Sequence, residues 1–250
     1  MSALVTGASG GLGAALAVAL AGAGQDVAVH YRGDAEGAAR TVTQVEATGR
    51  RAVALHADLA IDAAPDLDAA CDALLDAATD ALGPVDAVVL NAFPQDHTDW
   101  DDLDTAAWDA MHRGGLRPTT ALLHRATARM TAGGVVVAVG SIEGFRPAPT
   151  HAAYAVAKAA LHHLVAAAAH EVGARGVRVV GVAPGLVDRE GLAQAWPEGV
   201  ERWRRTSALG RPVSPEEVAA TVAFLASPAA SGITGTTVTV DAGWSAAPGW

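Results

Sequence analysis

Thr6-Gly7-Ala8-Ser9-Gly10-Gly11-Leu12-Gly13 is the stretch that decides the fold of this 250-residue chain. A short apolar run at 3–5 precedes it and an Ala- and Leu-rich stretch follows it, which predicts a strand, a glycine turn and a helix. Such a turn directs free backbone N–H groups and the positive end of a helix toward one point, where a pyrophosphate can bind. Glycine suits these positions because a Cβ would hinder either the backbone angles or the close approach of a ligand.

The same alternation of strand and helix continues to the end of the chain. Strands are predicted at 3–5, 27–29, 52–55, 87–90, 135–139, 177–182 and 236–240. Helices are predicted from the glycine turn to about 22–24, and at 36–47, 67–82, 105–130, 152–172 and 215–225. Uninterrupted apolar strands are typical of sheets covered on both faces, and the alternation predicts right-handed crossovers. We therefore expect an α/β fold: a single doubly wound domain over residues 1–250, with a seven-stranded parallel sheet flanked by helices.

Composition and charge exclude several kinds of protein. Hydrophobic residues make up 51% of the chain, which is ample for a core, and the net charge of −10 argues against nucleic-acid or anionic-membrane binding. Cys71 is the only cysteine, so no intramolecular disulfide can form, and no Cys/His set has zinc-like spacing. We find no signal segment, and Gly, charged residues or His interrupt the apolar runs before membrane-spanning length. We expect a soluble cytoplasmic protein without a metal.

Tyr154 and Lys158 form a candidate catalytic pair. They lie four residues apart in an Ala-rich helical stretch, so both side chains can reach the same small volume. A neighbouring cation favours the phenolate, which predicts a lowered pKa for Tyr154. Ser141 precedes the pair and adds a neutral hydroxyl donor. A Tyr-x-x-x-Lys pair alone also fits a solvated helix face, so the rest of the chain has to decide.

Together these motifs resemble the short-chain dehydrogenase/reductase family, and 3-oxoacyl-[acyl-carrier-protein] reductases in particular. The first motif is Thr6-Gly-x-x-x-Gly11-x-Gly13, and Ser141 and Tyr154-x-x-x-Lys158 follow in the expected order. Further matching pieces are Asp58-Leu59, Asn91-Ala92, Pro184-Gly185, Gly210-Arg211-Pro212, Pro215-Glu216-Glu217 and Val240-Asp241-Ala242-Gly243. The resemblance spans essentially the whole chain. It implies a Rossmann-type, NAD(P)-dependent oxidoreductase that assembles as a homo-oligomer, a tetramer or dimer, partly through the helices at 105–130 and 152–172.

The resemblance also implies residue roles. Ser141 would bind the substrate oxygen, Tyr154 would pass a proton to or from it, and Lys158 would bind the nicotinamide ribose while lowering the pKa of Tyr154. The implied cofactor-binding residues are Thr6, Gly7, Ser9, Gly11, Leu12, Gly13, Tyr31, Arg32, Asp58, Leu59, Asn91, Ala92, Tyr154, Lys158, Pro184, Gly185 and Val187. Without the resemblance, Asp58 would be interpreted as a helix cap and Asn91 as a loop stabiliser.

The end of the second strand favours NADP(H) over NAD(H). Proteins that bind NAD place an acidic residue there to receive the ribose hydroxyls. Counting from Gly13, that place falls on Tyr31, and Arg32 follows with a guanidinium that suits a phosphate. Alternatively, Asp34 neutralises Arg32, which is then a solvated surface residue.

Three positions depart from the family pattern. Gly115 stands where the family commonly has an Asn that anchors a water in the proton relay. Phe93 follows Asn91-Ala92 where the usual tripeptide is Asn-Ala-Gly. Arg189 lies near the place of a Thr that contacts the carboxamide. The pair Gly114-Gly115 weakens its helix by about 1 kcal/mol per glycine, which predicts a kink or a water-filled gap. Protons would then arrive through His112 or directly from solvent.

The segment at about 188–207 is a predicted substrate lid. It is rich in Trp and Arg, namely Trp196, Arg202, Trp203, Arg204 and Arg205. Their charge could attract a carboxylate- or phosphate-bearing substrate, or the segment could be a solvated amphipathic helix. Among the histidines, we expect His151 to face the pocket, His97 to lie in an exposed loop at 96–104, and His162 and His163 to lie on a helix surface.

These observations favour an NADPH-dependent enzyme that reduces a ketone or related carbonyl, or oxidises the matching alcohol. Candidate substrates are small molecules: 3-oxoacyl thioesters, cyclic ketones and pteridine-like compounds. The alternative is a catalytically silent NADP-binding regulator or scaffold, which Gly115 and Phe93 motivate. Intact Ser141, Tyr154 and Lys158 favour the enzyme, because a silent protein has no chemical need for all three.

Overall fold

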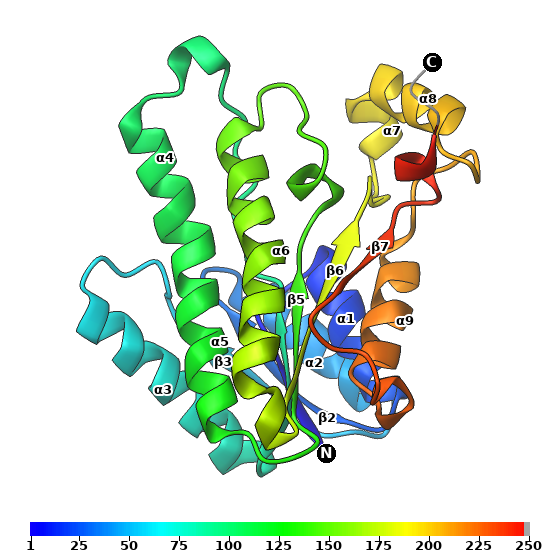
Figure 1. Cartoon of the computed structure of the whole chain (residues 1–250). Coiled ribbons are helices and arrows are strands. Elements are labelled where there is room, and N and C mark those ends of the chain that lie inside the picture. Colours follow the sequence, from blue (N-terminus) through cyan, green and yellow to red (C-terminus); the bar gives the residue numbers. More distant parts are fainter. Residues whose placement is uncertain (248–250) are drawn as a thin grey trace.

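The computed structural model describes residues 1–247, which form one seven-stranded sheet with helices against both faces (Figure 1). Residues 248–250 of the predicted domain lie outside the described residues. The strands are β1 (Ser2–Val5), β2 (Asp26–Tyr31), β3 (Ala52–His56), β4 (Val85–Leu90), β5 (Val135–Val139), β6 (Arg178–Pro184) and β7 (Thr237–Val240). Every neighbouring pair is parallel, in the order β3-β2-β1-β4-β5-β6-β7. The predicted Rossmann-type α/β fold with a seven-stranded parallel sheet is confirmed.

Helices cover the two faces of the sheet and bury one apolar cluster on each. The helices are α1 (Gly11–Gly22), α2 (Ala35–Glu46), α3 (Ala64–Leu82), α4 (Thr105–Met111), α5 (Arg117–Arg129), α6 (Ala152–Val172), α7 (Leu192–Ala195), α8 (Pro197–Thr206) and α9 (Pro215–Leu225). Leu16 of α1 and Val222 of α9 belong to one cluster. Leu74 of α3, Leu122 of α5 and Leu161 of α6 belong to the other. This two-sided burial explains why the strands are apolar throughout.

The strand order fixes where a ligand can bind. The order in which strands are added to the sheet reverses at β1: β2 and β3 lie on one side of it, and β4 to β7 lie on the other. In open parallel sheets the crevice lies outside the carboxyl ends of the strands at this point. The glycine turn at 6–13 follows β1, Asn91 follows β4, and Ser141 comes shortly after β5. The predicted site segments therefore meet at the carboxyl ends of neighbouring strands.

The predicted helical region at 105–130 is helical throughout residues 105–129, but part of it is not an α-helix. A π-helical segment, His112–Leu116, separates α4 from α5 and contains the Gly114-Gly115 pair. Glycine has low helix propensity, which makes this the weakest part of the helix. The expected water-filled gap is wrong, because the Phe93 ring fills the space: a Cβ on Gly115 would lie 2.6 Å from it.

One helical stretch in the described part of the chain, Ala152–Arg175, is long and apolar enough to cross a membrane. As predicted, Lys158, His162 and His163 interrupt its apolar residues. This stretch contains α6, and 50% of its most apolar window is buried inside the protein. Leu161 and Val165 contribute to the core cluster, and α6 packs against β6. Its apolar character is explained by its place in the core.

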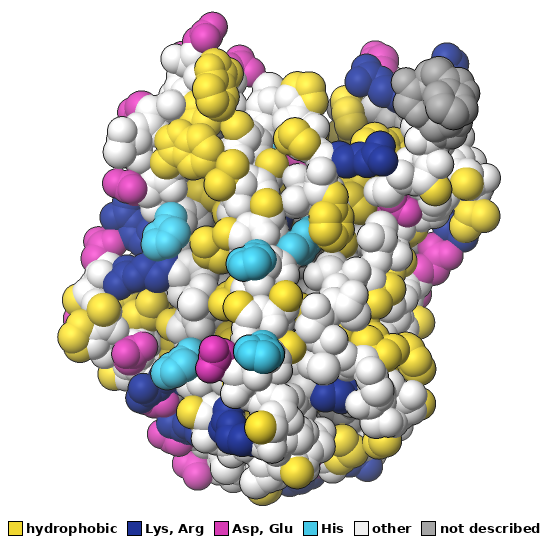
Figure 2. Space-filling view, in the orientation of Figure 1, with side chains coloured by type: hydrophobic (Ala, Val, Ile, Leu, Met, Phe, Trp, Pro, Cys, Tyr) yellow, Lys and Arg dark blue, Asp and Glu magenta, His cyan; other side chains and the backbone are white. Residues whose placement is uncertain are grey.

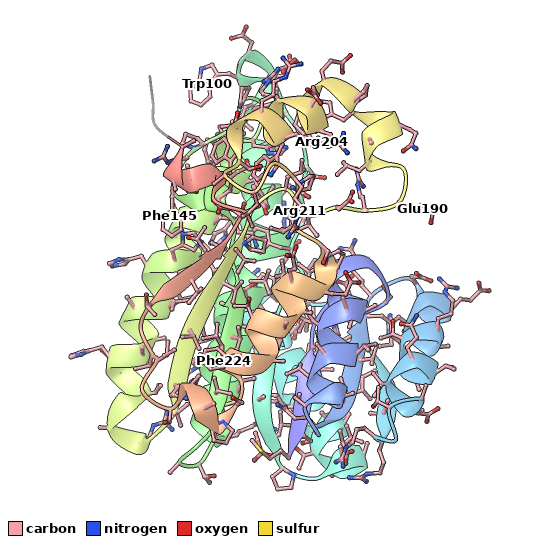
Figure 3. All side chains as sticks on the ribbon, turned by 90° about the vertical axis from the view of Figure 1, so that its right-hand side faces the viewer. Trp100, Phe145, Glu190, Arg204, Arg211 and Phe224 are labelled. Carbon is pink, nitrogen blue, oxygen red and sulfur yellow. The ribbon has the colours of Figure 1, made fainter. Side chains whose placement is uncertain are left out.

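Two parts of the molecule extend beyond the carboxyl ends of the strands. α4 and the loop before it form one, and α7 and α8 form the other (Figure 1). Hydrophobic side chains gather on the first, while histidines appear on the face over α5 and α6 (Figure 2). Trp100 and Arg204 lie at this same end of the molecule, far from Phe224 of α9 (Figure 3). The predicted lid at 188–207 corresponds to α7, α8 and the chain leading into them.

Candidate active site

Ser141, Tyr154 and Lys158 are buried together beyond the carboxyl end of β5. Ser141 caps a short 3-10 turn, Ile142–Gly144, and its Oγ accepts a hydrogen bond of 3.1 Å from the Glu143 N–H. The α6 helix carries Tyr154 and Lys158 on its buried face. Their exposed fractions are 8% for Ser141, 8% for Tyr154 and 2% for Lys158. A helix face buried against the sheet, rather than a solvated one, therefore carries the pair.

The pKa of Tyr154 moves opposite to the predicted direction. Burial raises it to about 12, a hydrogen bond with Ser141 opposes the rise, and the Glu143 carboxylate adds to it. Loss of water around a phenolate costs more than one neutral donor returns. The predicted lowering by Lys158 is wrong for this structure, and the phenol stays protonated at neutral pH.

The Lys158 ammonium is directed elsewhere. Its Nζ donates a hydrogen bond of 2.7 Å to the Val139 carbonyl and lies 3.8 Å from the centroid of the Phe93 ring. The centroid of the Tyr154 ring is farther away, at 5.5 Å. Burial lowers the pKa of Lys158 to about 7. Near neutral pH the Lys158 amine therefore gains or loses a proton at little cost in free energy.

Phe93 and Gly115, two of the departures, are one structural unit. The Phe93 ring lies edge-on to Tyr154, with centroids 5.9 Å apart and planes at 84°. A Cβ on Gly115 would lie 2.6 Å from the same ring, too close for any side chain. Phe93 thus occupies the space that a side chain at 115 would use, and it covers Lys158 from that side. Sequence inspection found both residues but not their connection.

The glycine turn has the geometry of a phosphate cradle. Gly7 and Gly11 have positive φ values of 62° and 53°, and a Cβ on Gly13 would lie 2.1 Å from the Gly7 carbonyl oxygen. The space beside Gly11 is open, with no atom within 4 Å of a Cβ placed there. Among the described residues, no side chain caps the N-terminus of α1. Free N–H groups beside open space fit a pyrophosphate.

Thr6 and Asn91 hold the turn in place. The Thr6 Oγ1 accepts hydrogen bonds from the N–H groups of Asn91 and Ala92, at 2.9 and 3.0 Å. The Asn91 Nδ2 donates to the carbonyls of Thr6 and Gly7, at 3.0 and 3.1 Å. In this structure Asn91 therefore acts as a loop stabiliser. It joins the end of β4 to the cradle.

His30 also supports the cradle, although sequence reasoning did not single it out. Its Nδ1 accepts a hydrogen bond of 3.2 Å from the Gly7 N–H, and its Nε2 lies 3.0 Å from the Ala57 carbonyl. Burial lowers its pKa, so the imidazole is neutral with the proton on Nε2. A histidine inside an otherwise apolar strand, one residue before Tyr31, was the available signal.

An exposed guanidinium, that of Arg32, lies directly after the end of β2. Arg32 is exposed beside half-buried Tyr31, whose ring centroid lies 5.4 Å from that of His56. Asp34 does not neutralise Arg32: it caps α2 through the Gly37 N–H, at 2.8 Å. Within residues 1–247, Arg32 makes no ion pair. The alternative in which Asp34 neutralises Arg32 is therefore wrong.

The remaining predicted cofactor residues lie at or beyond the carboxyl ends of the strands. Asp58 is exposed, and its Oδ1 accepts a hydrogen bond from Ala60, while Leu59 is buried. Gly185 donates to the Val240 carbonyl, and a Cβ there would lie 2.7 Å from Trp203. The others are half-buried: Ser9, Leu12 and Val187, with Pro184 buried at the end of β6.

The predicted lid segment is held by contacts with residues outside it and by contacts within it. Trp203 stacks on Trp244 with ring centroids 5.1 Å apart, and its indole donates to the Arg211 carbonyl. Arg205 pairs with Glu201 at 2.8 Å. Trp196 packs over Gly199, while Arg202, Arg204 and Arg189 are exposed (Arg204 in Figure 3). α8 is thus an amphipathic helix whose exposed face carries Arg202 and Arg204.

The histidines divide differently from the prediction. His151 is buried at the site, as expected, and His97 is exposed beside it. His163 lies on the helix surface, but His162 does not: its ring lies 4.1 Å from Phe145, and its Nε2 accepts a hydrogen bond of 3.5 Å from the Ser141 N–H. Burial, with Lys158 nearby, lowers the pKa of His162 to about 4. The prediction for His162 was wrong because a helix face four residues beyond Lys158 packs under Ser141.

Comparisons with known proteins agree with this geometry. A sequence model of the family described as enoyl-(acyl carrier protein) reductase matches residues 7–245. A 3beta-hydroxysteroid dehydrogenase 1 from Eggerthella lenta is 35% identical, over 99% of this chain and 94% of the relative. A cis-4-hydroxycyclohexanecarboxylate dehydrogenase from Sinomonas cyclohexanicum is 36% identical, over 98% and 96%. A short-chain dehydrogenase from Burkholderia cenocepacia, solved in complex with NADP, superposes with a TM-score of 0.87 at 34% identity, over 98% and 97%.

Proposed function

Since this chain belongs to the short-chain dehydrogenase/reductase family and is an NAD(P)-dependent oxidoreductase, we propose that it reduces a ketone with NADPH, or oxidises the matching alcohol. The observation that carries the proposal is the burial of Ser141, Tyr154 and Lys158 beside an open phosphate cradle. The catalytic residues we assign are these three. The described residues contain no cluster of His, Cys, Asp or Glu suited to a metal, and the mechanism uses none.

The Ser141 and Tyr154 hydroxyls act on the substrate oxygen. NADPH, when bound, supplies the hydride for the carbonyl carbon. As the oxygen gains negative charge, hydrogen bonds from the two hydroxyls strengthen, which stabilises the transition state more than the ground state. Tyr154 then gives its proton to the oxygen. Because burial holds its pKa at about 12, the phenol carries that proton at neutral pH and can donate it.

Lys158 and the cradle hold the cofactor. We infer that the Lys158 ammonium binds the nicotinamide ribose, since the Val139 carbonyl takes only one of its three N–H donors. The pyrophosphate binds the free N–H groups at the start of α1. The residues that would hold NADP are Thr6, Gly7, Ser9, Gly11, Leu12, Gly13, Tyr31, Arg32, Asp58, Leu59, Asn91, Ala92, Tyr154, Lys158, Pro184, Gly185 and Val187.

NADP(H) is the preferred cofactor in this proposal. The support is the exposed guanidinium of Arg32, which makes no ion pair within residues 1–247. In addition, β2 ends at Tyr31 and not at a carboxylate. The Asp34 carboxylate is occupied as the cap of α2. A 2′-phosphate gives a guanidinium two acceptor oxygens that a ribose hydroxyl lacks.

A cyclic ketone is the substrate class we place first. Two of the similar proteins are named for cyclic alcohols, a hydroxysteroid and a hydroxycyclohexanecarboxylate. The exposed Arg202 and Arg204 of the lid could attract a carboxylate on such a ring. A 3-oxoacyl thioester comes second, because a similar protein carries the name of a 3-oxoacyl-[acyl-carrier-protein] reductase.

We further propose that the whole chain works as a single domain in the cytoplasm, with residues 188–207 as its lid. A homo-oligomer, a tetramer or dimer, would form partly through α5 and α6, whose outer faces carry small Ala side chains. Size-exclusion chromatography with light scattering would measure the number of subunits.

A catalytically silent NADP-binding regulator is the second candidate. The specific observation in its favour is Phe93, which fills the place of a side chain at 115 and covers Lys158. NADPH and NADH consumption against cyclic ketones and 3-oxoacyl thioesters separates the two functions. Turnover that requires Tyr154 supports the enzyme, and tight NADPH binding without any turnover supports the regulator.

A further inference from the structure

A line of three ionisable side chains leads from the catalytic tyrosine to the protein surface. The His151 Nδ1 lies 2.7 Å from the Glu143 Oε2, and the His151 Nε2 lies 2.7 Å from the His97 Nδ1. The side chains of His151 and Glu143 are 9% and 17% exposed, whereas His97 is exposed. The three come from different segments: the turn after β5, the residue before α6, and the loop after β4. We call them the 97–151–143 relay.

The buried end of this relay lies beside both Ser141 and Tyr154. The Glu143 N–H donates to the Ser141 Oγ, and the Glu143 carboxylate is close enough to raise the pKa of Tyr154. The His151 ring packs edge-on against the Tyr154 ring, with centroids 5.7 Å apart. Glu143, His97 and Tyr154 are thus the ionisable groups that face His151, and Asp96 lines an adjacent cavity of about 120 Å³ with Thr150.

The opposite side of Tyr154 is closed. Phe93 packs against Tyr154 and over the Lys158 Nζ, and it fills the space beside Gly115. Lys158 itself is only 2% exposed and donates to the Val139 carbonyl. A proton from solvent therefore meets an apolar ring on the side of α4, where His112 lies. On the other side it meets the exposed imidazole of His97.

We propose that Glu143, His151 and His97 carry the protons that Tyr154 exchanges with solvent during turnover. This inference rests on the proposed function. During reduction the phenol O–H bond breaks as the O–H bond of the alcohol forms. The His97 imidazolium then gives a proton to the His151 Nε2 as the His151 Nδ1 gives its proton to the Glu143 carboxylate, and the carboxyl group so formed passes its proton through a water molecule to the phenolate. Solvent protonates His97 again, so one proton enters for each alcohol formed and no electron passes through the relay.

Three relay variants and two matched controls test this proposal in the full-length enzyme. Glu143→Gln and His151→Gln keep hydrogen-bonding groups but interrupt proton passage, and His97→Ala changes an exposed residue that the fold does not need. We expect each to lower kcat about tenfold or more with KM nearly unchanged, since positioned proton transfer contributes about 10²- to 10⁴-fold. The first control, His163→Ala on the exposed face of α6, should keep wild-type kcat. His112→Ala removes the alternative proton supplier that the sequence predicted: wild-type kcat would exclude that route, and a tenfold loss would overturn the relay.

Two further readouts separate a relay from a structural role. NADPH binding, followed by nucleotide fluorescence, should stay within about twofold of the wild type, because proton passage does not hold the nucleotide. Imidazole added to the buffer should restore most of the lost kcat in His97→Ala, since it can replace an exposed proton carrier. In the protein without nucleotide, ¹⁵N NMR should show that Glu143→Gln changes the chemical shift of the His151 Nδ1, because an amide replaces the carboxylate beside it.

The possible failures are distinguishable. Wild-type kcat in His151→Gln and Glu143→Gln would overturn the relay while the proposed function stands. Slow variants with weakened NADPH binding and no response to imidazole would also overturn it, in favour of a structural role. A wild-type enzyme that binds NADPH but reduces none of the carbonyls would overturn the proposed function, and the relay with it.

Discussion

The two ends of the crevice are built in different ways. At the nucleotide end, backbone conformation makes the site: positive φ at Gly7 and Gly11, close packing at Gly13 and free N–H groups at the start of α1. At the reaction end, packed side chains make the site, and burial moves the pKa of Tyr154 to about 12 and that of Lys158 to about 7. The proposed nucleotide end exposes polar backbone groups, whereas the catalytic side chains of the proposed reaction end are buried. Changes at each should therefore affect different quantities.

The largest expected effect is at the reaction end. Tyr154→Phe removes the proton donor while keeping the ring that packs against Phe93 and His151. We expect kcat to fall about 10²- to 10⁴-fold, because a positioned general acid contributes that much. The melting temperature should stay close to wild type, because the ring contacts remain. Turnover within a few-fold of wild type in this variant would show that another group donates the proton.

A methyl group in the cradle should break the nucleotide end instead. The Cβ of Gly13→Ala would lie 2.1 Å from the Gly7 carbonyl oxygen, so the turn must shift. We expect a loss of about 1–3 kcal/mol in the free energy of unfolding, typical of overpacking. Gly10→Ala is the matched control, since its φ is 178° and nothing lies within 4 Å. Equal stability of the two variants in urea unfolding would contradict the account of the cradle.

A double-mutant cycle tests whether Phe93 and Gly115 act as one unit. Gly115→Ala should destabilise the protein, because its Cβ would lie 2.6 Å from the Phe93 ring. In the presence of Phe93→Ala the same change should be tolerated, giving a coupling energy of about 1–2 kcal/mol. Additive effects in denaturant unfolding would mean that the two departures are independent.

Arg32→Ala should alter cofactor choice without altering chemistry. Loss of the guanidinium removes charge-assisted hydrogen bonds to a 2′-phosphate, so NADPH should bind about tenfold more weakly. NADH binding should be unchanged, since NADH lacks that phosphate. Arg40→Ala, on the exposed face of α2, is a control. Equal weakening of both nucleotides, measured by fluorescence titration, would remove Arg32 as the basis of preference.

The smallest expected change is spectroscopic. Tyr154 and Tyr31 are the only tyrosines, so the difference between wild type and Tyr154→Phe at 295 nm reports Tyr154 alone. A raised pKa means that the folded protein keeps the phenol proton beyond the usual value, so the difference should stay flat through pH 10. Half of the change should come at about pH 12 if the fold persists. Phenolate appearing below pH 9 would instead support the lowering by Lys158 that the sequence predicted.

The comparison of the two ends also explains what the sequence could predict. The sheet and the cradle follow from local patterns, since apolar runs, glycine spacing and a residue after each strand determine backbone geometry. The reaction end depends on contacts between distant segments. The residues around Phe93 in the sequence do not indicate that its ring fills the space beside Gly115. Those around His151 likewise do not indicate that it contacts both Glu143 and His97. The pKa of Tyr154 was mispredicted for the same reason, because burial depends on the complete packing.

Deuteride transfer tests the central claim most directly. NADPH carrying deuterium at the transferred position of C4 would be incubated with the wild-type enzyme and a panel of cyclic ketones and 3-oxoacyl thioesters. The alcohols would then be examined by mass spectrometry, with Tyr154→Phe alongside. The account predicts one deuterium on the carbinol carbon of at least one product, and almost none with Tyr154→Phe. Tight NADPH binding without deuterated alcohol from any substrate would contradict it and identify a silent NADP-binding protein.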